Sequence, residues 1–399
     1  MMKRLPISLL IVLCVVSCVD VRTDNPYDAS SCSVCITLQY PDGYAGFARA
    51  GVEVSLEEMN NTFVYSLLTD ESGKAVAQLP RGLYRVSVSD RSGQSIFNGT
   101  CDKVAVNGAT NLALPLKYSK AGTLVIREIY CGGCKKLPEV GDYQSDKYII
   151  LHNNDTRTVY LDSLCFGTLA PYNSNSSNPW GEIQDFAPII QALWQFGGDG
   201  KSFPLESGQD AVLCLNGAID HTVQYPLSVN LNRPDYFVCY NSTYFTNTVY
   251  HPAPGDQIAR ERILDVVIKV GKANAYAFSI SSPTVVIFRP QDTTIQEFVQ
   301  RGDTVIPIPG STSDNVVTIP WEWILDGVEV FNGSTTSNNK RLSSDVDAGF
   351  VTLSDTFLGH SLVRRVDEQA SAENGFTVLQ DTNNSSNDFV EFEKATLHE

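Results

Sequence analysis

Residues 69–89 read TDESGKAVAQLPRGLYRVSVS, a stretch in which two turn segments, DESG and PRG, bound two short β-runs. Asp and Gly are typical of tight turns because they accept backbone conformations that other residues resist. The second run alternates apolar with polar side chains, Tyr84, Val86 and Val88 against Arg85, Ser87 and Ser89. Successive side chains of a strand point to opposite faces, so the alternation predicts one face in a core and the other in water.

Similar short runs recur throughout residues 33–117, each bounded by turn residues, as in SVCITLQY at 33–40 and GVEVSLEE at 51–58. Their spacing is that of a small β-sandwich, and little sustained helical periodicity interrupts them. The segment YSKAG at 118–122 is interpreted as a short hinge. We therefore predict a first domain at 33–117 and a second at 122–399.

The stretch at 69–89 resembles the transthyretin-like, carboxypeptidase-regulatory-like domains of exported Bacteroidota proteins. The resemblance implies a β-sandwich that serves as a spacer or docking module. The block carries no catalytic signature.

The second block opens with GTLVIREIYCGG at 122–133, followed by DYQSDKYIILHNNDTRTVYLDSLCFG at 142–167. Its inward-facing positions are expected to be Ile149, Leu151, Val159, Leu161, Leu164 and Phe166, with Asn153, Asn154 and Asp155 turning the chain. The two segments resemble the lamin-tail type of immunoglobulin-like domain. The fold class is therefore predicted as all-β: two immunoglobulin-like β-sandwich domains, the second enlarged by loop insertions.

Further segments extend this resemblance, among them IPWEWILDGVEVF at 319–331, KRLSSDVDAG at 340–349 and QDTNNSSNDF at 380–389. Together they resemble an uncharacterised family of Bacteroidota lipoproteins described only as a domain of unknown function. The resemblance implies no established chemistry. It does imply a partner, because such lipoproteins are often made beside TonB-dependent outer-membrane receptors.

The N-terminus has the pattern of a lipoprotein signal. Lys3 and Arg4 precede the apolar run LPISLLIVLCVV, which is short for a transmembrane helix, and Val-Val-Ser-Cys ending at Cys18 resembles a bacterial lipobox. We expect a signal peptide at 1–17, a lipid on Cys18 and an acidic flexible tether at 18–32. These features predict an outer-membrane protein held in the membrane by its lipid and exposed at the cell surface.

The charge balance of the chain limits the classes of molecule that it is expected to bind. The chain has 29 Lys and Arg against 45 Asp and Glu, a formal net charge of −16, and no basic patch offsets it. Nucleic acid is therefore not expected as a partner.

Ten cysteines are present, and two close pairs stand out, Cys32 with Cys35 and Cys131 with Cys134. In an exported protein such pairs are loop disulfides or free thiols, half of a zinc site, or a redox pair. The five histidines are scattered and complete no zinc motif. No metal site is predicted.

No enzyme is predicted, because the sequence has neither a nucleophile elbow nor a marked pair of carboxylates. Binding is expected in the long loops that the second domain inserts, PYNSNSSNPWGEIQDF at 171–186 and NSTYFTNTVYHPAPGDQIARER at 241–262, unless these only cover sheet edges. The candidate ligand-binding residues are Asp220, His221, Tyr244 and Tyr250.

The acidic and amide-rich run at 380–389 is not a calcium loop of the EF-hand type, because Ser386 stands where glycine is required and Phe392 where the bidentate glutamate is required. An irregular structural calcium site formed with other loops stays open. No other cofactor is expected.

The alternative for this run is a structural clasp. Asp381 and Asn383 would cap a turn, and Asp388 would pair with Arg364 or Arg365 of the preceding strand. A buried pair of this kind would hold the last strand against its sheet.

Two functions from different classes follow. The first is a lipoprotein that captures a nutrient, a peptide, glycan, haem or chelated iron, for a TonB-dependent transporter. The second is a structural or adhesive surface protein that presents its loops to a partner protein.

Overall fold

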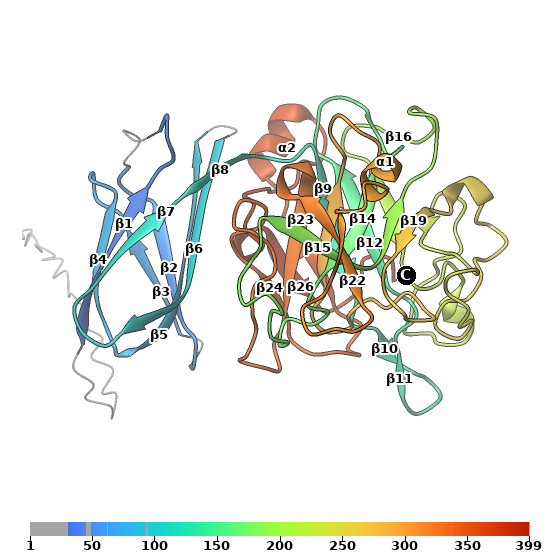
Figure 1. Ribbon diagram of the computed structural model, residues 1–399, viewed down its shortest axis with the longest axis horizontal. Helices are drawn as coiled ribbons and strands as arrows, with labels where there is room; N and C mark the ends of the chain where they lie inside the picture. The colour runs from blue at the N-terminus through green and yellow to red at the C-terminus, as the bar shows by residue number, and fades with distance from the viewer. Residues whose placement is uncertain (1–30, 45–48, 62, 93–94, 399) are drawn as a thin grey trace, which may run out of the picture.

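The computed structural model describes residues 31–44, 49–61, 63–92 and 95–398 (Figure 1). Strands dominate, and the α-helices of the described residues are short: α1 (Ile295–Val299), α2 (Glu368–Asn374) and α3 (Ser385–Asp388). The predicted all-β class is confirmed. The expected signal peptide, Cys18 and nearly all of the tether lie outside the described residues. Within the described ranges no helix has the length and apolar character needed to cross a membrane.

The N-terminal module consists of two sheets that pack face to face. The first has the strand order β3 (Val64–Leu68), β2 (Glu53–Glu58), β5 (Gly82–Ser92), β6 (Ser95–Val106), β8 (Lys117–Lys120), and the second the order β4 (Lys74–Leu79), β1 (Cys32–Gln39), β7 (Thr110–Pro115). The apolar face expected at Tyr84, Val86 and Val88 is buried between them.

The polar face of β5 is only partly in water, which corrects the expectation for Arg85, Ser87 and Ser89: Arg85 is buried, and Ser87 and Ser89 are half-buried. This face is turned toward the C-terminal module, and the Arg85 side chain is buried. Its guanidinium donates to Asp102 at 2.6 Å and to Glu57 at 3.1 Å, and lies 4.8 Å from the ring centre of Phe350. Polar alternation therefore marks an interface between modules here.

The C-terminal module is built on two larger sheets (Figure 1). One has the order β18 (Phe237–Val238), β17 (Asp210–Cys214), β12 (Tyr148–Asn153), β9 (Leu124–Tyr130), β25 (Ser361–Arg364), β26 (Phe389–Phe392). The other has the order β21 (Val305–Pro307), β22 (Asn315–Pro320), β15 (Phe186–Gln195), β14 (Cys165–Leu169), β20 (Thr284–Phe288), β23 (Ile324–Asn332), β24 (Val351–Leu353), with β19 (Asp265–Lys269) paired to β15. Two short ribbons complete the module, β10 (Cys134–Lys135) with β11 (Asp142–Tyr143) and β13 (Val159–Tyr160) with β16 (Pro204–Leu205).

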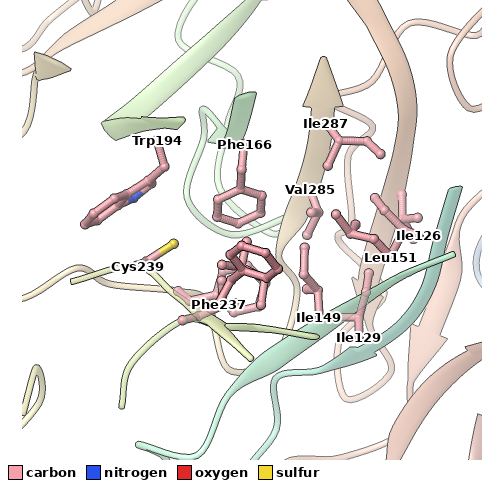
Figure 2. Packing of buried hydrophobic residues seen from close by; sticks show 14 of the residues in the cluster. Ile126, Ile129, Ile149, Leu151, Phe166, Trp194, Phe237, Cys239, Val285 and Ile287 are labelled. Carbon is pink, nitrogen blue, oxygen red and sulfur yellow. The ribbon is translucent and has the colours of Figure 1, made fainter. Parts of the chain in front are cut away.

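The main core lies between these two sheets. Figure 2 shows Ile149 and Leu151 of one sheet opposite Phe166 and Ile287 of the other. All six residues expected inside, from Ile149 to Phe166, belong to this cluster or pack against it.

Both outer faces of the C-terminal sandwich are covered as well. One is packed under segments that include α1 and Trp323, and the other under the chain at 229–240 and the C-terminal Ala395. All six residues of β12 are consequently buried. A strand buried on both faces is apolar almost throughout, which explains the run YIILHN better than simple alternation does.

The run at 380–389 meets Arg364 in the interior of the module. The Arg364 guanidinium lies 2.6 Å from Asp326, 3.1 Å from Asp381 and 3.5 Å from Asp388, and its Nε donates to the carbonyl of Ile126. All four charged side chains of this Arg364 cluster are buried.

Burial raises the pKa of the Asp326 and Asp388 carboxyls, and the charge of Arg364 acts in the opposite direction. Backbone N–H groups supply further donors, from Ile126 to Asp326 and from Thr382 to Asp388. A guanidinium and several N–H donors therefore surround the carboxylate oxygens that a cation would need, which favours the clasp over calcium. As expected, the Asp381 carboxylate accepts from the backbone N–H of Asn383, at 3.3 Å. The short helix α3 that follows is capped by Asn384, whose side chain accepts from the Ser386 N–H.

The same run joins the two modules. Asn98 of β6 donates its amide to the carbonyls of Thr382 and Asn383 at 2.7 and 2.9 Å, and Asn383 donates to Ser119 of β8 at 2.7 Å. Most of the expected hinge at 118–122 therefore belongs to strand β8, which pairs with β6 and accepts a hydrogen bond from Asn383 at Ser119. The residue limits of the predicted domains stay predictions.

The Arg364 cluster makes Arg364→Met strongly destabilising, because three buried carboxylates would lose their shared cation. We expect a loss of about 3 to 5 kcal/mol in the free energy of unfolding, measured by urea denaturation. The neighbouring Arg365 is exposed and donates to the Asn387 carbonyl, so Arg365→Met is the matched control and should cost less than about 1 kcal/mol. Equal losses in the two variants would contradict the role given to Arg364.

Candidate functional site

The expected loop at 241–262 lies at one end of the C-terminal module. The yellow-green chain between β18 and β19 lies on the side away from the β1–β8 module (Figure 1). Tyr244 and Tyr250 of this segment are 45% and 50% exposed, and Val249 is 73% exposed. Three large side chains on one loop therefore face solvent.

A cavity of about 360 Å³ opens beside this loop. We call it the tyrosine pocket, and its walls include Gln144, Lys147, Tyr172, Asn216, Tyr250 and Tyr276. Tyr172 comes from the expected loop at 171–186 and Tyr250 from the loop at 241–262. Both rings are partly exposed, so each offers an apolar face to a ligand that enters.

The candidate residues are thus only partly brought together. Tyr250 lines the tyrosine pocket, whereas Tyr244, Asp220 and His221 are not among its lining residues. The clasp candidates Arg364, Arg365, Asp381, Asn383 and Asp388 belong to the interior and to the contact between modules.

Asp220 and His221 do not form a catalytic pair. The Asp220 carboxylate accepts from the backbone and hydroxyl of Thr222 and caps a short 3₁₀ turn. The buried His221 donates from Nε2 to the Gly217 carbonyl and accepts at Nδ1 from the Tyr143 hydroxyl at 2.6 Å. Burial lowers the pKa of His221, so the ring is held neutral with both nitrogens engaged.

Lys147 is a pocket residue that sequence reasoning missed. Its side chain is buried, immediately before the core strand β12, and its ammonium donates to the Phe278 carbonyl at 2.7 Å. Burial lowers its pKa to about 8, while the nearby Cys131 and Asp146 raise it. A lysine next to an apolar run, in QSDKYIIL, was the available signal.

Asn216 is a second pocket residue that the sequence analysis did not identify. It is 5% exposed, and its amide nitrogen donates to the Tyr276 carbonyl at 2.6 Å. Its side-chain oxygen has no hydrogen-bond partner among the described residues. Because an unpaired buried acceptor is costly, this oxygen is a candidate contact for a ligand.

His251 fixes the beginning of the loop at 241–262, because its ring contacts residues 240, 241 and 245. It is buried, accepts from the Asn241 N–H at 3.2 Å and lies against the rings of Tyr240 and Phe245. Burial lowers its pKa to about 4. The loop that carries Tyr250 is therefore closed by a neutral imidazole.

The second CxxC pair has the chemistry of buried thiols. Cys131 and Cys134 form no disulfide, and burial raises the pKa of each to about 12. A redox pair instead needs a low thiol pKa. Across the described residues, no three His, Cys, Asp or Glu side chains are grouped so as to hold a metal ion.

Known proteins resemble this chain in part. Residues 206–396 match the model of a family described as "Protein of unknown function (DUF4876)". We call residues 206–396 the DUF4876 region. No curated protein matches the chain significantly.

The chain resembles the crystal structure of a DUF4876 family protein from Bacteroides thetaiotaomicron, with 22% identity over 90% of this chain and 94% of that one and a TM-score of 0.55. The two proteins share a fold. Much weaker similarities are to a DUF3823 family protein from Parabacteroides merdae, at 15% identity over 38% of this chain and 69% of that one with a TM-score of 0.18, and to a putative adhesin from Bacteroides ovatus, at 9% identity over 83% and 94% with a TM-score of 0.21.

The DUF4876 region holds the whole Arg364 cluster but only part of the tyrosine pocket. Asn216, Tyr250 and Tyr276 lie inside it, whereas Lys147 and Tyr172 come from the part of the chain before residue 206. The pocket therefore needs more of the chain than the family match spans.

Thiol labelling should separate the cysteines by burial. With iodoacetamide and site-resolved mass spectrometry, we expect the half-buried Cys35 and Cys101 to react in the native protein. Cys131 and Cys134 should react only after denaturation, because they are buried and held as thiols. Rapid native labelling of Cys134 would restore a redox role for the pair.

The loop closed by His251 should lose stability in mild acid. The folded-state pKa of about 4 lies below the ordinary 6.5, so the unfolded chain takes up a proton that the folded chain resists. The stabilisation is complete above pH 6.5 and is lost as the pH falls toward 4. Between pH 7 and 5 the wild type should lose about 2 kcal/mol more than His251→Phe, since one pKa unit corresponds to about 1.4 kcal/mol.

Urea denaturation of both proteins at the two pH values measures this difference. All other titrating groups are common to the pair and cancel in the comparison. Parallel pH dependence in wild type and variant would show that His251 titrates normally.

Proposed function

We propose that this chain is a non-enzymatic binding protein that captures a small polar ligand in the tyrosine pocket. The observation that carries the proposal is the pocket itself: two partly exposed tyrosines from two separate loops border a cavity with a buried lysine and a buried amide at its walls. Binding sites in proteins commonly combine an apolar lining with a few placed polar groups. The separation of Asp220 from the His221 ring supports binding over catalysis.

The proposed setting comes from the sequence. A lipid on Cys18 would anchor the protein in the outer membrane, and the acidic tether would expose it at the cell surface. The N-terminal module, with its transthyretin-like resemblance, would act as a spacer. The lamin-tail-like C-terminal module would present the pocket and pass its ligand to a TonB-dependent receptor.

An adhesive or structural role is the second candidate. It is supported by exposed apolar side chains on the loops of the C-terminal module, Val223 at 84% and Val249 at 73%. Such side chains suit contact with a protein partner. Under this candidate the loops bind a macromolecule and the tyrosine pocket takes no small ligand.

The two candidates are separated by a binding screen of the purified protein against short peptides, oligosaccharides, haem and ferric chelates. Capture predicts saturable binding of one class, measured by calorimetry. Tyr250→Ala should then weaken it by about tenfold or more, because one aromatic wall is lost. Tyr244→Ala is the matched control, since Tyr244 is similarly exposed on the same loop but does not line the pocket.

Equal weakening by the two variants would place binding on the loop surface and support the adhesive candidate. Absence of any saturable small ligand, together with stable co-purification with a membrane protein, would overturn capture.

A further inference from the structure

The charge of the tyrosine pocket is opposite to that of the chain. The chain has a formal net charge of −16, yet among the described residues Lys147 is the only charged side chain that lines this pocket. Four amide side chains share the lining with it: Gln144, Asn216, Asn247 and Asn274.

Lys147 is poorly compensated for a buried cation. Its ammonium has three N–H donors, and the Phe278 carbonyl is its one hydrogen-bond acceptor among the described residues. No carboxylate of the described chain lies within ion-pair distance of it. The neighbouring buried Asp146 raises the pKa of Lys147 through its charge but makes no ion pair with it. One Asp146 oxygen accepts from Tyr130 at 3.1 Å and from Ser228 at 2.6 Å, and the other has no hydrogen-bond partner among the described residues. A buried charge of this kind is stabilised by an anion that enters the pocket.

Asn216 adds a second requirement: besides the anionic group for Lys147, a ligand must carry a hydrogen-bond donor. Its amide nitrogen is held by backbone carbonyls, so the rotamer is fixed and the unpartnered oxygen must accept a hydrogen from outside the described chain. A ligand that satisfies both groups carries an anionic oxygen close to an O–H or N–H donor.

We infer that the tyrosine pocket binds an acidic sugar, with a uronate carboxylate on the Lys147 ammonium and a sugar hydroxyl donating to the Asn216 side-chain oxygen. The inference rests on the proposed function of this pocket as a ligand site. The amide-rich lining favours a sugar over a peptide carboxylate, because amides both donate to and accept from hydroxyl groups. The partly exposed Tyr172 and Tyr250 rings offer flat apolar surfaces to a sugar ring. The cavity of about 360 Å³ admits a single sugar residue of a longer chain.

The test compares two sugars that differ at one group. Galacturonate and galactose are titrated into the purified protein by ligand-observed NMR and calorimetry, and galacturonate should bind about tenfold more tightly or better. In Lys147→Met, which has nearly the same length without the charge, this preference should vanish while weak binding of both sugars remains. A thermal melt of the variant checks that it is folded.

A second measurement does not depend on the variant. Galacturonate affinity of the wild type should fall as the pH rises through 8, where Lys147 loses its proton, while galactose affinity stays level.

Each other outcome overturns the inference in a distinguishable way. Equal binding of the two sugars, blocked by Tyr250→Ala, would leave the capture function intact and remove the acidic class. Binding of a short peptide with a free C-terminus, lost when that terminus is amidated, with no sugar binding, would assign the pocket to peptide carboxylates. If neither the sugars nor the peptide binds, both the acidic class and Lys147 as an anion site fail.

Discussion

The Arg364 guanidinium, buried among Asp326, Asp381 and Asp388, is the interaction on which the C-terminal module depends. It links three parts of the chain that are distant in sequence: strand β23, strand β25 and the run before β26. A buried cation with several carboxylates is stable only as a complete set, since loss of one partner leaves uncompensated charge in a medium of low polarity. The cluster therefore specifies one arrangement of these segments.

The same run extends this order to the N-terminal module. Asp381 accepts from the backbone of Gly122, and the carbonyls of Thr382 and Asn383 accept from Asn98. Arg85 is paired with Asp102 of its own module, and its guanidinium lies 4.8 Å from the ring centre of Phe350 in the C-terminal module. Polar groups that would be solvated on a separate sandwich are instead paired across the modules, which fixes how they lie against each other.

The side of the C-terminal module that carries the tyrosine pocket is held together differently. The loop that carries Tyr250 connects β18 to β19 and contains no strand among its described residues. It is held in place by contacts of the neutral His251 ring with the Asn241 N–H and the Tyr240 ring. Lys147, by contrast, is buried immediately before the core strand β12. A pocket with one wall beside a core strand and another on a loop combines a fixed polar contact with an adjustable apolar one, which suits the ligand capture proposed above.

By itself the sequence determined the β class and the inward faces of strands such as Tyr84–Val86–Val88 and Ile149–Leu151, because these depend on local periodicity. Complementary charge also limited the cation that pairs with Asp388 to Arg364 or Arg365. It also indicated the two loops from which Tyr172 and Tyr250 come. Only the tertiary structure decided that the polar face of β5 is an interface, that Asp220 and His221 are structural, and that Lys147 and Asn216 border one cavity. The reason is physical: the role of a polar side chain depends on its burial and on the partners that packing leaves within reach, and both are properties of segments far apart in the chain.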